Sequence, residues 1–112
     1  MVNEGVLGRH HFGGEHAHTE DHPAVILSGK VKAGTVAMPA GMLLAVDGNG
    51  DIIPYAGTGL VGVNDLPYAV GDEVCTYLAH GTVKARLLVK SGNAPAVAAD
   101  IKALNTMGVW PV

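Results

Sequence analysis

The hydrophobic positions of this chain form short runs that are separated by glycine, proline and acidic residues. The clearest run, residues 42–46, is followed by Asp-Gly-Asn-Gly-Asp and then by a second apolar run at residues 52–55. Glycine, asparagine and aspartate tolerate the positive φ angles that match a tight turn to the twist of two paired strands. The pattern therefore predicts a β-hairpin from residue 42 to residue 55, and we place the centre of the domain there.

Apolar runs on either side of this hairpin predict further strands. Residues 24–28 and 60–63 have the length and the β-branched composition of short strands. Residues 74–79 and 82–89 predict a second hairpin, with its turn at the His-Gly pair between them. In the last of these strands, alternate side chains beginning at Val83 are expected to face the core, because strand side chains alternate between two faces.

Only one segment has convincing helical spacing, and it lies near the C-terminus. Residues 96–107 are predicted to form a helix that begins after Pro95 and is stopped by Gly108. Asp100 is expected to point outward. The apolar positions follow the four-then-three spacing of one helix face and are Val97, Ile101 and Leu104.

The first part of the chain has a different texture. Residues 1–23 contain five of the six histidines and four glycines, and their apolar residues follow neither the helical nor the strand period. Such a segment cannot bury enough surface to offset its ordering entropy, so we expect an arm that a partner surface orders. The predicted organisation is an extended N-terminal arm at residues 1–23 and a compact β-rich domain at residues 24–112. The predicted fold class is mainly β, a small β-barrel or β-tulip-like domain with one short C-terminal helix.

Composition narrows the classes of partner. Of the 112 residues, 48% are hydrophobic and only 15% are charged, and the formal net charge is −3. A surface with few charges suits contact with copies of the chain or with another protein. Lysine and arginine are sparse, which disfavours binding to nucleic acid or to an anionic membrane. The first residues lack a basic start followed by an apolar core, so we do not expect export. No apolar run reaches the roughly 18 residues of a membrane-spanning helix, so we do not expect membrane insertion.

The turn of the central hairpin has a partial calcium-loop pattern. Asp47, Asn49 and Asp51 stand at the first, third and fifth positions of such a loop. The sixth position should be glycine and is Ile52, and the twelfth should be a bidentate glutamate and is Thr58. The missing ligands favour a solvated hairpin turn.

The histidines of the arm are candidate metal ligands. His16 and His18 flank Ala17, and an extended backbone would point both rings to the same side, where they could chelate an ion. A flexible arm offers no rigid frame for a metal site, however, so we predict no dedicated metal and no cofactor, with His16 and His18 as the alternative. The histidines could also be plain solvated residues, bind metal ions adventitiously, or form a contact that weakens or strengthens as they gain charge with falling pH. The nearby histidines and carboxylates are His10, His11, His22, Glu15, Glu20 and Asp21.

Two other residues carry expectations. Cys75 is the single cysteine, which excludes an internal disulfide and predicts a buried, inert thiol, because no base for a nucleophile is suggested nearby. Val109 and Trp110 lie in an apolar tail after the helix. A tryptophan so near a terminus either folds back on the core or enters a subunit contact, and the sequence leaves both open.

The order of these signals resembles that of the lambda-like head decoration proteins of tailed bacteriophages. No single motif is diagnostic, and the likeness covers roughly residues 24–112. The segments that carry it are residues 34–36, 47–55, 60–63, 74–90 and 99–110. The resemblance implies a small, mostly β protein that forms trimers on the outside of the expanded capsid, at its local three-fold positions. It also implies no catalytic residues, so the chain is expected not to be an enzyme.

The resemblance further implies a partner and a role for the arm. Proteins of this family clamp neighbouring major capsid proteins against internal genome pressure, partly through an N-terminal arm that adds strand-like pairing to the shell. They are made in the host cytoplasm and end in the virion. The His-rich arm of this chain departs from the family pattern. The predicted capsid-binding residues of the arm are Val2, Val6, Leu7, His10, His11 and Phe12, and the candidate subunit contact is Val109 and Trp110.

Two alternatives belong to other functional classes. The first is a His-rich metal-binding protein or an enzyme built on the histidine cluster. The second is a small monomeric β-barrel that acts as a binding module. A trimer on a viral shell would separate the main hypothesis from both.

Overall fold

Eight β-strands and one α-helix make up the part of the chain that the computed structural model describes, residues 16–112. The strands are β1 (Val25–Lys30), β2 (Leu43–Val46), β3 (Ile52–Pro54), β4 (Leu60–Asn64), β5 (Val74–Val83), β6 (Val89–Lys90), β7 (Ala94–Pro95) and β8 (Val109–Pro111). The helix is α1 (Ala98–Met107), and two single 3₁₀ turns are η1 (Ala85–Leu87) and η2 (Ser91–Asn93). The predicted fold class, mainly β with one short C-terminal helix, is confirmed.

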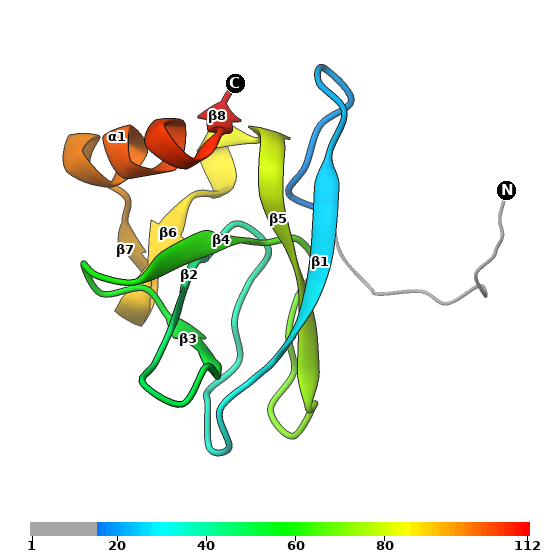
Figure 1. Cartoon of the computed structure of the whole chain (residues 1–112), viewed down its shortest axis with the longest axis vertical. Coiled ribbons are helices and arrows are strands. Elements are labelled where there is room, and N and C mark those ends of the chain that lie inside the picture. Colours follow the sequence, from blue (N-terminus) through cyan, green and yellow to red (C-terminus); the bar gives the residue numbers. More distant parts are fainter. Residues whose placement is uncertain (1–15) are drawn as a thin grey trace, which may run out of the picture.

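The main sheet has the strand order β1-β5-β4-β2-β3, and these neighbours are antiparallel. Figure 1 shows the long β1–β5 pair on one side of the molecule and α1 on the other. β8 pairs in parallel with the end of β5, from Gly81 to Val83. The short β6 and β7 form a separate pair.

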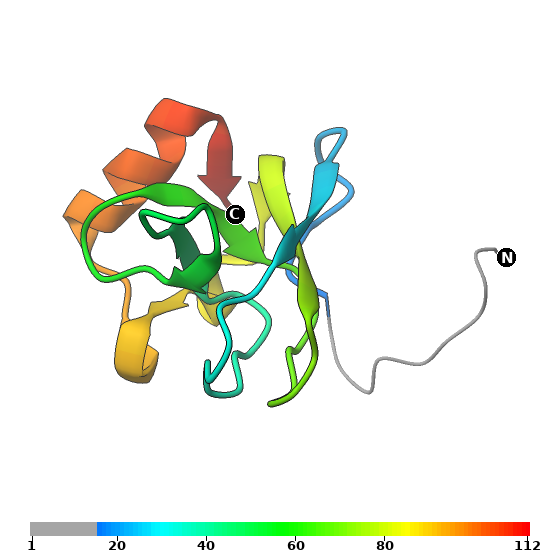
Figure 2. The same cartoon turned by 60° about the horizontal axis from the view of Figure 1, so that its bottom comes forward.

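The main sheet curls so that its two outer strands approach each other. Directly after β1, Val31 forms a parallel bridge with Ile52 of β3. The N–H of Lys32 donates to the carbonyl of Ile52 at 3.0 Å. A Cβ on Gly29 would lie only 2.8 Å from the Ile52 side chain, so the absent side chain allows this close approach. The meeting of the outer strands agrees with the small barrel that was predicted (Figure 2).

The central hairpin prediction is confirmed. β2 and β3 pair antiparallel, with Val46 opposite Ile52. The side chain of Asp47 organises the turn, since its Oδ1 accepts from the N–H of Asn49 at 2.9 Å and from the N–H of Asp51 at 3.0 Å. The bond from Asp51 contributes most to a lowered pKa of Asp47. These contacts make the segment a self-bonded turn, as the missing calcium ligands indicated.

The predicted second hairpin is wrong. β5 continues through His80 and Gly81 as one ten-residue strand. Gly81 has a φ of 133° and its N–H donates to the carbonyl of Gly108 at 2.9 Å. The glycine therefore lets the strand pass from its partners β1 and β4 to its partner β8, without reversing the chain. Beyond β5 the strand alternation expected from Val83 onward fails, because residues 85–87 form η1.

The predicted helix is present, with two corrections. It begins at Ala98 rather than at residue 96, and Val97, which was expected on its apolar face, precedes the first turn and is 51% exposed. α1 ends at Gly108, whose φ of 98° suits the left-handed cap. Asp100 was expected to point outward, but it is buried. Its carboxylate accepts from the N–H of Val97 at 2.9 Å and pairs with the ammonium of Lys90 at 3.1 Å. Helix capping, which the apolar spacing does not report, turns this side chain inward.

Residues before position 24 also pack against the β domain. Ala17 is 0% exposed and belongs to the same core cluster as Leu43, Leu78 and Leu104. Residues 16–22, which were predicted to belong to the arm, are therefore attached to the domain. We call residues 16–22 the arm root. Within the described residues, no helix combines the length and the apolar character that crossing a membrane requires.

Candidate functional site

The arm root is held by backbone hydrogen bonds on both sides of Ala17. The N–H of Ala17 donates to the carbonyl of Asp65 at 2.8 Å, and its carbonyl accepts from the N–H of Lys84 at 2.9 Å. The N–H of Thr19 donates to the carbonyl of Thr82 at 3.0 Å, and the hydroxyl groups of Thr19 and Thr82 are also in contact. The root therefore lies along the end of β5 as an added, short antiparallel segment.

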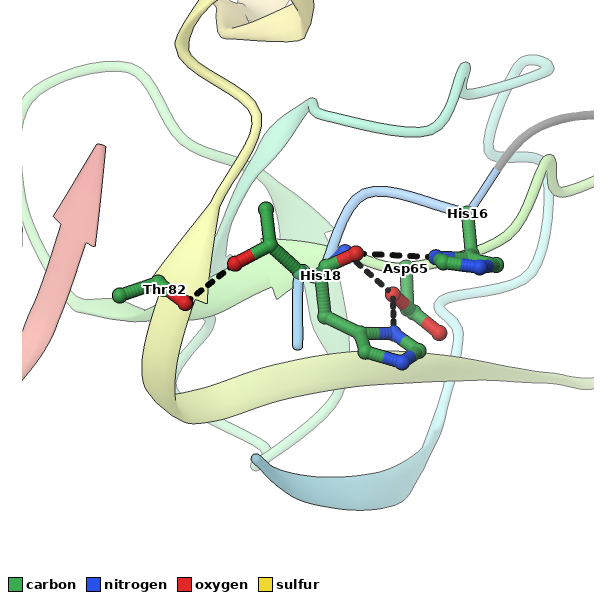
Figure 3. A network of polar contacts seen from close by, with 5 residues as sticks. His16, His18, Asp65 and Thr82 are labelled. Atoms are coloured by element: carbon green, nitrogen blue, oxygen red, sulfur yellow. Dashed lines mark hydrogen bonds and ion pairs between the residues drawn. The ribbon is translucent and has the colours of Figure 1, made fainter. Parts of the chain in front are cut away.

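Asp65 receives the arm root at the end of β4. Its Oδ1 accepts from the backbone N–H of His18 at 3.0 Å and from the Nδ1–H of the same residue at 2.8 Å (Figure 3). Burial by itself would raise the pKa of Asp65, but the hydrogen bonds from His18 outweigh it and the pKa is lowered. For His18 the hydrogen bond to Asp65 raises the pKa, against a smaller opposing effect of burial. The two groups thus favour the ionised pair.

His16 lies beside this pair. Its Nδ1–H donates to the carbonyl of His18 at 2.9 Å, and the two imidazoles stack with their centroids 4.2 Å apart and their planes at 21°. The prediction that both rings lie on the same side is confirmed. Together with Asp65 they form a cluster in which one potential ligand atom of each residue lies within 4.8 Å of those of the other two.

A second group of rings lies where β1, β5 and β8 meet. His80 contacts Trp110 edge to face with centroids 5.3 Å apart, and His22 lies 5.4 Å from each of them. His80 was expected at a solvated turn but lies within β5. Val109 is buried in the core of its own chain, which removes it as a candidate subunit contact, whereas Trp110 is 38% exposed. Trp110 therefore packs against its own chain and still presents part of its ring to the surface.

The edge strand β1 has an apolar surface. Val25 is 47% exposed, Ile26 38% and Leu27 45%, so large apolar side chains face solvent on both faces of the strand. β1 pairs with β5 on one side and ends the strand order on the other. An exposed edge that carries apolar side chains is typical of a surface that pairs with another chain. We call residues 25–27 the β1 patch.

One pocket of the described residues contains the single cysteine. Cys75 lines a surface pocket of about 310 Å³, but burial raises the pKa of its thiol to about 11, so the thiol is protonated at neutral pH. Tyr68 lies at the same pocket, and its hydroxyl donates to the carbonyl of Asp72 at 2.6 Å. The predicted burial of the Cys75 thiol is confirmed.

Sequence reasoning found part of this site and missed one member. The predicted arm residues Val2, Val6, Leu7, His10, His11 and Phe12 lie outside the described residues. His16 and His18 are brought together as expected, but no role was predicted for Asp65 from the sequence. Its signal was weak: a carboxylate directly after an apolar strand, 47 residues away from its histidine partner. No protein-family model matches the chain, and a search of curated proteins finds no similar one.

Proposed function

We propose that this chain is a structural virion protein that binds the outside of an expanded phage capsid as trimers. It stabilises the shell by clamping neighbouring major capsid proteins, and it performs no catalysis. The observation that supports this best is the β1 patch, an exposed apolar edge of the β body. The order of sequence segments, which resembles that of head decoration proteins, supports the identity of the partner.

The β1 patch contributes to binding through apolar burial. Fully burying a valine, leucine or isoleucine side chain is worth about 1.5–3 kcal/mol. Because Val25, Ile26 and Leu27 are roughly half exposed, covering all three contributes about 2–4 kcal/mol per subunit. Three subunits that bind one shell act at high effective concentration, so a modest contribution from each becomes firm attachment. The clamp then stabilises the assembled shell by mass action, because it binds the shell and not its free subunits.

The test mixes the purified chain with expanded, undecorated phage heads. Sedimentation with the heads should saturate at a fixed ratio, and images of the shell should show copies in threes. A chain that begins at His16 keeps Ala17 in the core and removes only the remainder of the arm. It should bind more weakly, while circular dichroism shows an unchanged fold.

A matched pair of variants tests the β1 patch. Leu27→Lys places a charge in the patch, whereas Val36→Lys places one at a side chain that is 67% exposed in a loop. The first should weaken binding to the heads and the second should not. Failure of the chain to bind heads under any condition would refute the proposed function, and equal binding by both variants would remove the β1 patch from it.

A further inference from the structure

His16, His18 and Asp65 gather two imidazoles and a carboxylate at the arm root (Figure 3). Imidazole nitrogen and carboxylate oxygen are the ligands that zinc and its first-row neighbours take from proteins. We propose that these three residues bind one divalent transition-metal ion, with zinc the best match to the donor set, and that water completes the coordination. The inference is independent of capsid binding.

The distances within the cluster suit such an ion. Zinc binds nitrogen and oxygen ligands at about 2.0–2.2 Å, which places neighbouring ligand atoms of a tetrahedron about 3.4 Å apart. Asp65 Oδ1 and His18 Nδ1 are 2.8 Å apart, and the three potential ligand atoms lie within 4.8 Å of one another. The first separation is slightly shorter than the required one and the others are at most 4.8 Å, so the proposed site needs side-chain rotations to bring the three groups onto one ion. The ion takes the place of the proton between His18 and Asp65, because metal ligands bind deprotonated.

The backbone around the cluster supplies the rigid frame that the sequence did not predict. Ala17, between the two histidines, is fully buried and hydrogen-bonded to Asp65 and Lys84 through its own N–H and carbonyl. Asp65 is held in turn by its N–H, which donates to the carbonyl of Thr76 at 2.9 Å. The reason for expecting no dedicated metal, a mobile arm without support, therefore does not hold for His16 and His18.

Outer contacts orient the ligands. The carbonyl of His18 can only accept, so His16 carries its proton on Nδ1 and has a free electron pair on Nε2. The backbone N–H of His18 holds the Asp65 carboxylate at 3.0 Å, and this bond persists when an ion replaces the ring proton. Hydrogen bonds of this kind, from the ligand to a backbone group, fix ring tautomers and carboxylate orientation in metal sites. A bound ion would tie the first described residue of the arm root to the body.

The experiment titrates zinc chloride into the full-length chain by calorimetry, after treatment with a chelator. The parent should bind one ion per chain with a saturable affinity. His16→Ala should bind at least about 100-fold more weakly, a larger loss than removal of an outer-shell partner causes. Among the described residues, the ring of His16 is held by the bond to His18, the stacking contact and an electrostatic contribution from Asp65, so we expect this variant to keep the fold, which circular dichroism can verify.

The control is the triple variant His10→Ala, His11→Ala and His22→Ala, which removes histidines that the site does not use. It should retain the tight event. Cobalt absorption spectra add a second measurement, since the parent should show a defined coordination band that His16→Ala and Asp65→Asn alter. Absence of a saturable event in the parent, its persistence in His16→Ala, or its loss in the triple control would overturn the assignment.

Discussion

Replacing Asp65 by alanine removes the acceptor of two hydrogen bonds that hold the arm root to the body. The carboxylate accepts from the backbone N–H of His18 at 3.0 Å and from its ring at 2.8 Å. The Asp65 side chain is 6% exposed and the His18 side chain is 23% exposed, so solvent screens the pair only in part. We therefore expect Asp65→Ala to unfold more easily and His18→Ala to show a smaller effect.

The magnitude follows from the two bonds. A hydrogen bond to a charged group contributes about 1.5–3 kcal/mol, and partial exposure of the imidazole reduces its share, so Asp65→Ala should cost about 2–4 kcal/mol. His18→Ala should cost about 1–2 kcal/mol, because the backbone bond to Asp65 remains. For a domain of this size each kcal/mol lowers Tm by about 4–5 °C, which predicts a fall of about 10–20 °C for Asp65→Ala.

Urea unfolding in a buffer with a chelator measures these values without any contribution from a metal ion. Fluorescence of the single tryptophan and circular dichroism should give coincident transitions. The double variant completes a thermodynamic cycle whose coupling energy should be about 1–1.5 kcal/mol, the share of the ring-to-carboxylate bond. A coupling energy near zero, or equal losses in the two single variants, would refute the idea that this pair anchors the arm root.

Three further predictions concern the body. The pKa of Asp100 is lowered, mainly by the hydrogen bond from the backbone N–H of Val97 at the start of α1. Its charged form therefore stabilises the fold above the unfolded pKa of 3.8, and this contribution is lost as pH falls through the lower folded pKa. The stability difference between the parent and Asp100→Asn should shrink below about pH 4 in urea titrations. Cys75, with a pKa of about 11, should react with iodoacetamide at pH 7.5 far more slowly than a free thiol, unless urea is added. Gly62→Ala should cost about 1–3 kcal/mol because the new Cβ would clash with the carbonyl oxygen of Leu78. Gly48→Ala, with open space around it, should be neutral in the same denaturation assay.

The arm root links the two proposals physically. A clamp transmits load only if the segment that leaves the body is fastened to it. Ala17 anchors the arm root through its burial in the core, and Asp65, directly after β4, anchors it through hydrogen bonds to His18. An ion bound at His16 would add a further attachment of the arm root to the domain. Capsid binding by His16→Ala, compared with the parent in the presence and absence of zinc, would show whether the two properties are coupled.

Local chemistry in the sequence determined the elements whose causes are local. The turn from Asp47 to Asp51 forms from its own side-chain and backbone groups, and Gly108 ends α1 through its left-handed φ. Both were predictable because the relevant residues are neighbours in the chain. The mainly β class likewise follows from short apolar runs between turn residues.

Contacts between distant segments decided the rest. Gly81 was predicted to turn the chain, but hydrogen bonding to Gly108 keeps it in β5, and no local pattern carries that information. Asp65 becomes part of a site only because Ala17 is buried against the core and places His18 over the end of β4. The sequence determined which residue types were present and where the chain could turn. Only the tertiary structure decided which of them share a surface, because burial and strand pairing act between residues that are far apart along the chain.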